Sequence, residues 1–298
     1  MTPPLATLVT ASLDRKLPDP VRAIAASLGA EAGAQAVLFY GSNLRTGALD
    51  GVLDFYVLLP GPPERGIWPT VGYREFDHGP RTLRAKIATM RMATFAQAAG
   101  DGSLDTTIWT RFVQPSAIAW AADDSARAHV AEAIAAAAVT AARYAAALGP
   151  ERGEPADYWR ALFRATYAAE LRVEAKGREE QIIDVNRCHL TALLPAAWAA
   201  VGLAFDDEGG RIAPALDPVA RATIVARWRR RQRLGKPINL IRLVRAAFTF
   251  DGAARYGAWK IERHTGVHVT ITPWRERHPV LAAPAVLWRV WRARRKLS

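Results

Sequence analysis

A strand, a tight turn and a second strand are predicted by the stretch Val37-Leu-Phe-Tyr-Gly-Ser-Asn-Leu-Arg-Thr-Gly-Ala-Leu-Asp-Gly-Val-Leu-Asp-Phe-Tyr-Val-Leu-Leu59. Its first apolar run, Ala36–Tyr40, passes directly into Gly41-Ser42. Its second run, Gly51–Leu59, carries a single acidic residue, Asp54. Short apolar runs bounded by glycine or proline are typical of buried strands. We therefore expect two neighbouring strands with an acid on the second, close to the turn that ends the first.

The sequence around this pair predicts an α+β fold. Residues 1–35 have helical spacing, and strand-like runs recur at Arg84–Met90 and within residues 107–120. We expect a mixed-sheet domain over residues 1–122.

The pattern becomes helical at Asp123, which can cap a helix. An alanine-rich run follows and ends at Gly149-Pro150, and Gly235-Lys-Pro237 is expected to stop a later basic helix. We predict a mainly helical domain over residues 123–235 and a basic C-terminal region over residues 236–298. Further elements are expected at four places: helices at Tyr158–Lys176, Glu180–Leu203 and Pro218–Leu234, and a strand at Val267–Thr272.

Charge is concentrated in the last quarter of the chain. The whole chain carries +12, and residues 221–298 hold 19 lysines and arginines against three acids, a local charge of +16. Such a segment indicates an anionic partner, either nucleic acid or an acidic membrane, although a basic surface can also serve solubility. The single cysteine, Cys188, excludes a disulfide scaffold and favours a reducing compartment. The apolar runs Val130–Leu148 and Leu190–Phe205 are expected to be buried helices rather than membrane spans.

The turn and the strand acid resemble the signature of polymerase-β-type nucleotidyltransferases. Eleven residues separate Gly41-Ser42 from Asp54. A glycine-serine turn lets backbone N–H groups approach a triphosphate, and a carboxylate on the next strand can hold Mg²⁺ against the same phosphates. In that superfamily a second acid generally follows two residues later, where this chain has Tyr56. Asp50, four residues before Asp54, is the candidate for a second metal ligand.

Four blocks in the same order resemble the family of peripheral, mitochondrial-type phosphatidate cytidylyltransferases, with this chain as a distant bacterial-type member. They are Phe39–Ser42 with Leu53–Phe55, Ala85–Ile87 with Ile108–Pro115, Thr166–Arg172, and Leu240–Lys260. Three positions depart from the family pattern: Asn43 replaces a glycine, Gln114 a lysine, and Ala169-Glu170 a Gly-Asp pair.

The resemblance implies a nucleotidyltransferase-type fold, Mg²⁺ as cofactor, and the transfer of CMP from CTP to phosphatidate with release of pyrophosphate. It also implies roles for individual residues. Gly41 and Ser42 would cradle the β- and γ-phosphates, Asp54 would hold the metal, and Lys86 and Arg111 would offset charge on the triphosphate. Arg172 and Lys260 would bind the nucleotide or the lipid phosphate.

A C-terminal amphipathic helix is predicted over residues 284–298. Pro284 suits a first helical turn, Val286 and Trp291 fall on an apolar side, and Arg292 falls on a basic one. A helix of this length is too short to span a bilayer and is typical of interfacial binding. We expect a peripheral membrane protein on the cytoplasmic face of the inner membrane, which binds CTP, phosphatidate and anionic lipid but no nucleic acid. The alternatives are a nucleotidyltransferase acting on RNA or tRNA, and a non-catalytic membrane-associated protein on the same fold.

Overall fold

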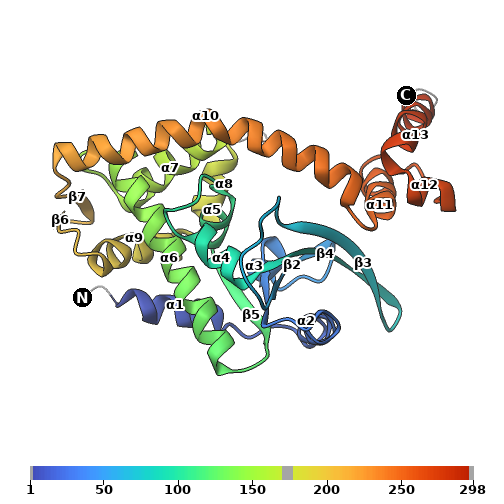
Figure 1. Ribbon diagram of the computed structural model, residues 1–298, viewed down its shortest axis with the longest axis horizontal. Coiled ribbons are helices and arrows are strands. Elements are labelled where there is room, and N and C mark those ends of the chain that lie inside the picture. The colour runs from blue at the N-terminus through green and yellow to red at the C-terminus, as the bar shows by residue number, and fades with distance from the viewer. Residues whose placement is uncertain (1–2, 170–176, 295–298) are drawn as a thin grey trace.

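The computed structural model describes residues 3–169 and 177–294, which form an α+β structure with a mixed five-stranded sheet (Figure 1). The strand order is β3-β4-β2-β1-β5, in which β2 and β4 run parallel and the other pairs antiparallel. The strands are β1 (Ala36–Tyr40), β2 (Val52–Leu59), β3 (Thr70–His78), β4 (Arg81–Arg91) and β5 (Ser116–Ala121). The strand–turn–strand prediction around Gly41 is therefore confirmed.

Side chains of β1 and β2 alternate between two cores on the two faces of the sheet. Phe39 and Phe55 face helix α2 (Asp19–Ala32) and pack on Val21 and Leu28. The next positions along the same strands, such as Tyr56, enter a larger core on the opposite face. That core is formed with α1 (Leu5–Leu13), α4 (Met92–Ala99), α5 (Thr107–Phe112) and α6 (Asp124–Leu148).

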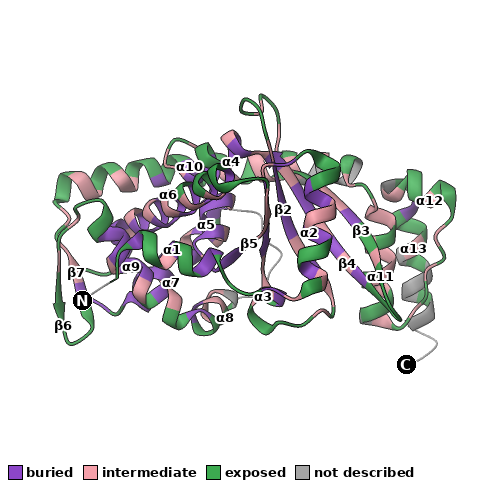
Figure 2. Ribbon diagram, turned by 90° about the horizontal axis from the view of Figure 1, so that it is seen from below, coloured by how far each residue is buried: buried purple, intermediate pink, exposed green. Residues whose placement is uncertain are grey.

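Helix α6 is the centre of the helical part of the molecule (Figure 2). Asp123 caps it, because its carboxylate accepts a 2.7 Å hydrogen bond from the Ala126 N–H. It is the one described helix that is long and apolar enough to cross a membrane, and 67% of its most apolar window is buried inside the protein, as expected for a core helix. It packs on α7 (Pro155–Ala169) and α9 (Arg187–Ala200).

Helix α10 (Pro218–Thr249) corrects one prediction. The helix does not stop at Gly235-Lys-Pro237 but continues for twelve residues beyond Pro237 (Figure 1). A β-carbon on Gly235 would lie 2.6 Å from the carbonyl oxygen of Ala169, so this glycine allows α10 to pass close to α7. The proposed boundary between residues 235 and 236 thus falls inside a continuous helix.

Other predicted elements also differ from the structure. Residues 107–120, expected to contain strand-like runs, are divided: helix α5 takes residues 107–112, and strand β5 begins at Ser116. The expected helix at residues 180–203 is divided into α8 (Arg178–Val185) and α9, and β6 (Phe205–Glu208) and β7 (Arg211–Pro214) follow as a hairpin. Residues 267–272 do not form a strand.

Three helices follow α10 beyond the edge of the sheet: α11 (Ala253–Thr265), α12 (Pro273–Arg277) and α13 (Pro279–Arg294). The predicted C-terminal helix is present, but it begins at Pro279, so that Pro284 lies in its interior rather than in its first turn. Residues 295–298 of that prediction lie outside the described residues.

Candidate functional site

One transverse row of residues crosses all five strands of the sheet. Tyr73 on β3 is in register with Lys86 on β4, Lys86 with Asp54 on β2, Asp54 with Tyr40 on β1, and Tyr40 with Ser116 on β5. Residues directly opposite one another on neighbouring strands point to the same face, about 4.8 Å apart. The row therefore places an acid and a lysine side by side at the end of β1.

The turn after β1 packs directly on this acid. Gly41 has φ 88° and ψ −160°, a backbone conformation that is essentially confined to glycine. A β-carbon at this position would lie 3.0 Å from Oδ2 of Asp54. Ser42 then opens the short helix α3 (Ser42–Thr46). Glycine is thus required twice at position 41, by its φ angle and by the carboxylate beside it.

Asn43 fixes the loop that joins this turn to β2. Its buried side-chain amide donates to the carbonyl oxygens of Ala48 at 2.9 Å and Asp50 at 2.8 Å. Asn43 therefore has a structural role here. Asp50 is exposed on this loop and is not one of the residues that line the cleft described below.

The carboxylate of Asp54 is half-buried and lies between cations. Burial raises its pKa above the usual 3.8, and the nearby charges of Lys86 and Arg111 oppose that rise. Among the described residues, it accepts no hydrogen bond and forms no ion pair at contact distance. Its oxygens are therefore open to a cation or to a ligand.

Lys86 is also half-buried, and its pKa is lowered. Burial is the main cause, Asp54 opposes it, and Arg111 and Lys260 add to the lowering by charge repulsion. Within residues 3–169 and 177–294 the Lys86 ammonium has no hydrogen-bond partner. A buried ammonium among other cations is stabilised by an anion, so the site favours a negatively charged ligand.

Arg111 is held from α5 by two aromatic rings. Its Nη1 donates to the Tyr56 hydroxyl at 3.2 Å, and its guanidinium lies 5.5 Å from the ring centre of Tyr40 and 5.9 Å from that of Tyr56. Tyr56, two residues after Asp54 on β2, thus orients this arginine. An arginine remains charged at any physiological pH, so the cleft keeps a fixed cation beside Asp54.

These residues line a cleft of about 580 Å³, within the range of small-molecule sites. Its lining includes Gly41, Ser42, Asp54, Lys86 and Arg111. Helix α8 contributes a further wall, with Gln181, Ile182, Asp184 and Val185. Thr110 also lines the cleft; its hydroxyl is buried and has no hydrogen-bond partner among the described residues.

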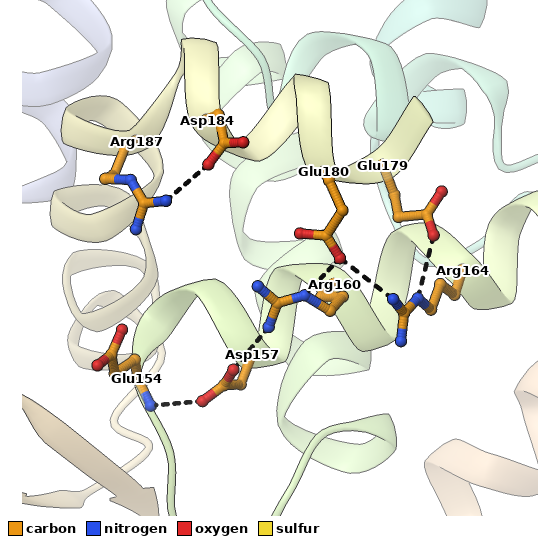
Figure 3. Close-up of polar contacts among 8 residues, drawn as sticks. All are labelled: Glu154, Asp157, Arg160, Arg164, Glu179, Glu180, Asp184 and Arg187. Carbon is orange, nitrogen blue, oxygen red and sulfur yellow. Dashed lines mark hydrogen bonds and ion pairs between the residues drawn. The ribbon is translucent and has the colours of Figure 1, made fainter. Parts of the chain in front are cut away.

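The α8 wall is fixed to α7 by ion pairs (Figure 3). Arg160 binds Asp157 at 2.6 Å and Glu180 at 2.7 Å, and Arg164 binds Glu179 and Glu180, both at 3.1 Å. Ile183, on the same helix, is buried in the large core. The wall is therefore anchored by both charge and packing.

The structure brings most of the predicted site residues together. Gly41, Ser42, Asp54, Lys86 and Arg111 share the cleft, and Lys260 on α11 is close enough to lower the pKa of Lys86. Arg172 lies outside the described residues.

Asp184 and Thr110 are among the cleft residues that the sequence analysis did not assign to the site. Asp184 lies on the α8 wall and forms a 2.6 Å ion pair with Arg187. Both residues come from helices whose position beside the turn depends on tertiary packing, and no local sequence pattern marks them.

The residues of the cleft fit Mg²⁺ as an ion held by Asp54 together with a bound phosphate. Over residues 3–169 and 177–294 no group of three or more His, Cys, Asp or Glu side chains could hold a metal. Magnesium is usually bound by one or two carboxylates together with substrate phosphates and water, rather than by a cage of protein ligands. Asp54, with no partner among the described residues, meets that requirement if a phosphate is present.

Comparison with protein-family models and with curated proteins finds no match to this chain.

Proposed function

We propose that the chain is a Mg²⁺-dependent nucleotidyltransferase that transfers CMP from CTP to phosphatidate. The observation that supports this proposal best is the pair Asp54 and Lys86. These two half-buried opposite charges are in register on neighbouring strands, and among the described residues neither has a hydrogen-bond partner. An acid available for Mg²⁺ beside a lysine available for phosphate suits a metal–nucleotide ligand.

The surroundings of this pair agree with a nucleotidyltransferase-type domain. The Gly41-Ser42 turn lies against the acid, and Arg111 adds a fixed positive charge. Backbone N–H groups of the turn and these cations would neutralise a triphosphate. The choice of CTP and phosphatidate within this class rests on the resemblance of the sequence blocks.

The proposed reaction needs little acid–base chemistry. A phosphate oxygen of phosphatidate attacks the α-phosphorus of CTP and forms the new P–O bond. The bond from the α-phosphorus to the bridging oxygen breaks, and that oxygen leaves with the electron pair as part of pyrophosphate. The attacking oxygen is already ionised near neutral pH, so no strong base is required, and the residues act by positioning and charge.

Each residue has a defined part in this reaction. Gly41 and Ser42 hold the β- and γ-phosphates, Asp54 holds Mg²⁺, and Lys86 and Arg111 offset the charge that develops on the phosphates. Mg²⁺ bound there supplies further positive charge to the reacting phosphates.

A peripheral location at the cytoplasmic face of the inner membrane is part of the proposal. Two large apolar side chains of α13 are exposed, Leu281 (67%) and Trp288 (55%), and they lie seven residues apart on one side of the helix. Arg292 is exposed and lies over the Trp288 ring at 5.3 Å. An exposed helix with apolar and basic residues is typical of binding to anionic lipid.

A second candidate function, nucleotidyl transfer to RNA, is favoured by α10. Arg229, Arg230, Arg233 and Lys236 are exposed along this helix, and none forms an ion pair with another described residue. Such a row of cations also suits a phosphate backbone. Binding of an RNA hairpin that weakens steeply with salt, together with nucleotide addition to that RNA, would favour this function.

The experiment that tests the proposal is pyrophosphate release with each of the four nucleoside triphosphates, Mg²⁺ and phosphatidate vesicles. Release with CTP alone among the four, dependent on both Mg²⁺ and phosphatidate, is the expected result. A CTP thermal-shift assay with and without Mg²⁺ separates a non-catalytic nucleotide binder from an inert scaffold, since a ligand that binds only the folded state raises its stability.

A further inference from the structure

Helix α11 packs against the end of the transverse row, on the side away from the Gly41-Ser42 turn. The Tyr73 N–H donates to the carbonyl oxygen of Asp251 at 2.8 Å, and the ring centres of Tyr73 and Tyr256 are 5.5 Å apart. Tyr73 is the residue of the row next to Lys86. The helix therefore adds a wall beside Lys86, beyond the residues that line the cleft.

This wall carries cations that lack acidic partners. Lys260 and Arg263 are exposed on α11, and neither forms an ion pair with any residue in the described part of the chain. Lys260 lies 5.9 Å from the ring centre of Tyr256, and its charge lowers the pKa of Lys86. Tyr256 in turn is close enough to Asp54 for that carboxylate to contribute to the raised pKa of its hydroxyl.

Arg263 is held in position by Trp259. Its guanidinium lies 5.3 Å from the ring centre of Trp259, and Arg84 lies 5.5 Å from the same ring. Arg84 is itself paired with Glu75 at 3.4 Å. A β-carbon on Gly51 would lie 3.1 Å from Nη1 of Arg263, so this guanidinium reaches the turn that precedes β2. Arg263 is therefore oriented but not neutralised.

The order of the strands separates these cations from the turn. Gly41 follows β1, Asp54 lies on β2 and Lys86 on β4, so the acid lies between two regions that can bind anions. Neighbouring strands are about 4.8 Å apart, so these two regions lie close to the acid on either side. In phosphoryl transfer the attacking oxygen and the leaving oxygen lie roughly in line on opposite sides of the phosphorus. With pyrophosphate leaving on the side of the turn, the attacking oxygen arrives from the side of α11.

We infer that Lys260 and Arg263, together with Lys86, form a second anion site that binds the phosphate monoester of the acceptor substrate. The inference rests on the proposed function and adds the position of the acceptor. A site of three cations suits a dianionic phosphate that attacks through an ionised oxygen, rather than a neutral hydroxyl group that would require a base.

The test uses the full chain and dihexanoyl phosphatidate, a soluble acceptor that needs no membrane. Arg263→Met and Lys260→Met keep the aliphatic stem and remove the charge. Arg15→Met is the control, because Arg15 is an exposed arginine between α1 and α2, outside the cleft. We expect each α11 variant to raise the KM for the acceptor about tenfold, while the affinity for CTP with Mg²⁺ changes less than twofold. The control should change neither quantity, and Arg263→Lys should recover part of the loss.

Direct binding of dihexanoyl phosphatidate, measured by calorimetry without nucleotide, separates this inference from the proposed function. Weaker binding by both α11 variants than by the control supports the anion site even if no triphosphate gives pyrophosphate release. Unchanged acceptor binding in both variants, or an equal loss of CTP affinity, would overturn it. So would a wild-type chain that binds CTP but shows no binding of the acceptor.

Discussion

Gly41 and Asp54 form a single packing unit, because a β-carbon at position 41 would lie 3.0 Å from Oδ2 of the carboxylate. Gly41→Ala should therefore displace either the turn or the acid and should reduce pyrophosphate release strongly. The strained backbone should also lower the free energy of unfolding by about 1–3 kcal/mol. Both are measured on one preparation, by turnover and by denaturant unfolding.

The matched control for this variant is Gly47→Ala. Gly47 also has a positive φ of 68°, but a β-carbon there would have no neighbour within 4 Å. It should lose stability without losing activity. Equal activity losses in the two variants would show that backbone strain alone, and not the contact with Asp54, affects the site.

Asp54→Asn should abolish turnover without unfolding the chain. Burial raises the pKa of Asp54, so the folded chain binds this proton more tightly than the unfolded chain. The contribution of Asp54 to the free energy of unfolding therefore falls as pH rises from 3.8 through the folded-state pKa. At pH 7 the buried charge of Asp54 consequently destabilises the wild type. The ligand-free variant should melt at the same or a higher temperature than the wild type, and release pyrophosphate at least about a hundredfold more slowly.

Asp77→Asn, an exposed change at the edge strand β3, controls for loss of one negative charge. Asp77→Asn should leave both the melting temperature and the rate of pyrophosphate release unchanged. Normal pyrophosphate release by folded Asp54→Asn would remove the basis of the proposed function.

A comparison of Asp184→Asn with Asp50→Asn tests which acid assists Asp54. Asp184 lines the cleft, whereas Asp50 is exposed on the preceding loop. The first change should raise the Mg²⁺ concentration for half-maximal rate by on the order of tenfold, and the second should have the smaller effect. A larger effect of Asp50→Asn than of Asp184→Asn would identify Asp50 as the second metal ligand, as the sequence predicts.

Arg242→Met should destabilise the fold through α5. Arg242 on α10 binds the buried carboxylate of Asp105 at 2.8 Å, and that carboxylate also accepts hydrogen bonds from the backbone N–H and the hydroxyl of Thr107, at 2.9 and 2.6 Å. These contacts fix the start of the helix that carries Arg111. Removal of one partner from a buried pair leaves an uncompensated charge, at a cost of about 3 kcal/mol in the free energy of unfolding.

The control for this prediction is Arg22→Met, which breaks an exposed ion pair with Asp19 and should leave the unfolding midpoint nearly unchanged. The double variant Arg242→Met with Asp105→Asn should recover part of the loss. No recovery would place the effect in the packing of Arg242 on Trp68, whose ring centre lies 4.5 Å from the guanidinium.

Leu281→Ser combined with Trp288→Ser should weaken membrane binding. Both side chains are exposed on α13, so their loss removes apolar area available to lipid without opening the core. Co-sedimentation with vesicles of phosphatidylcholine and phosphatidylglycerol in equal parts should fall about tenfold or more. Val219→Ser, at an exposed position of α10, is the matched control, and equal binding by all three proteins would exclude α13 as the anchor.

Local patterns predicted the strands and the turn around Gly41 correctly. The strand–turn–strand unit at Gly41 depends on residues that are neighbours in the sequence. Asp54 lies in the middle of one continuous apolar run, so a local pattern marks it as well. The expectation for residues 107–120 was correct only for the part in β5, because a short apolar segment suits either a strand or a buried helix. Gly235 was read as a helix stop because the sequence does not show the carbonyl of Ala169 that passes beside it.

The other walls of the cleft depend on packing between distant segments. Asp184 reaches the cleft because ion pairs fix α8 on α7. Arg263 reaches the turn before β2 because Tyr73 and Asp251 join the strand edge to the start of α11. Neither contact has a signature within its own segment. Sequence patterns therefore located the acid and the turn but not the groups that face them.

The two sides of the site are held by different elements, the sheet on one side and the long helix α10 on the other. Gly41 directly follows strand β1 of the sheet, whereas α11 follows α10, a helix of 32 residues and so about 48 Å in length. Gly235 and Pro237 lie near the middle of α10, and a proline there removes a backbone hydrogen bond and lowers resistance to bending. A bend of about 10° at that point would move the end of the helix, roughly 18 Å further on, by roughly 3 Å. A bend of α10 at this point would therefore move α11, with Lys260 and Arg263, relative to Asp54.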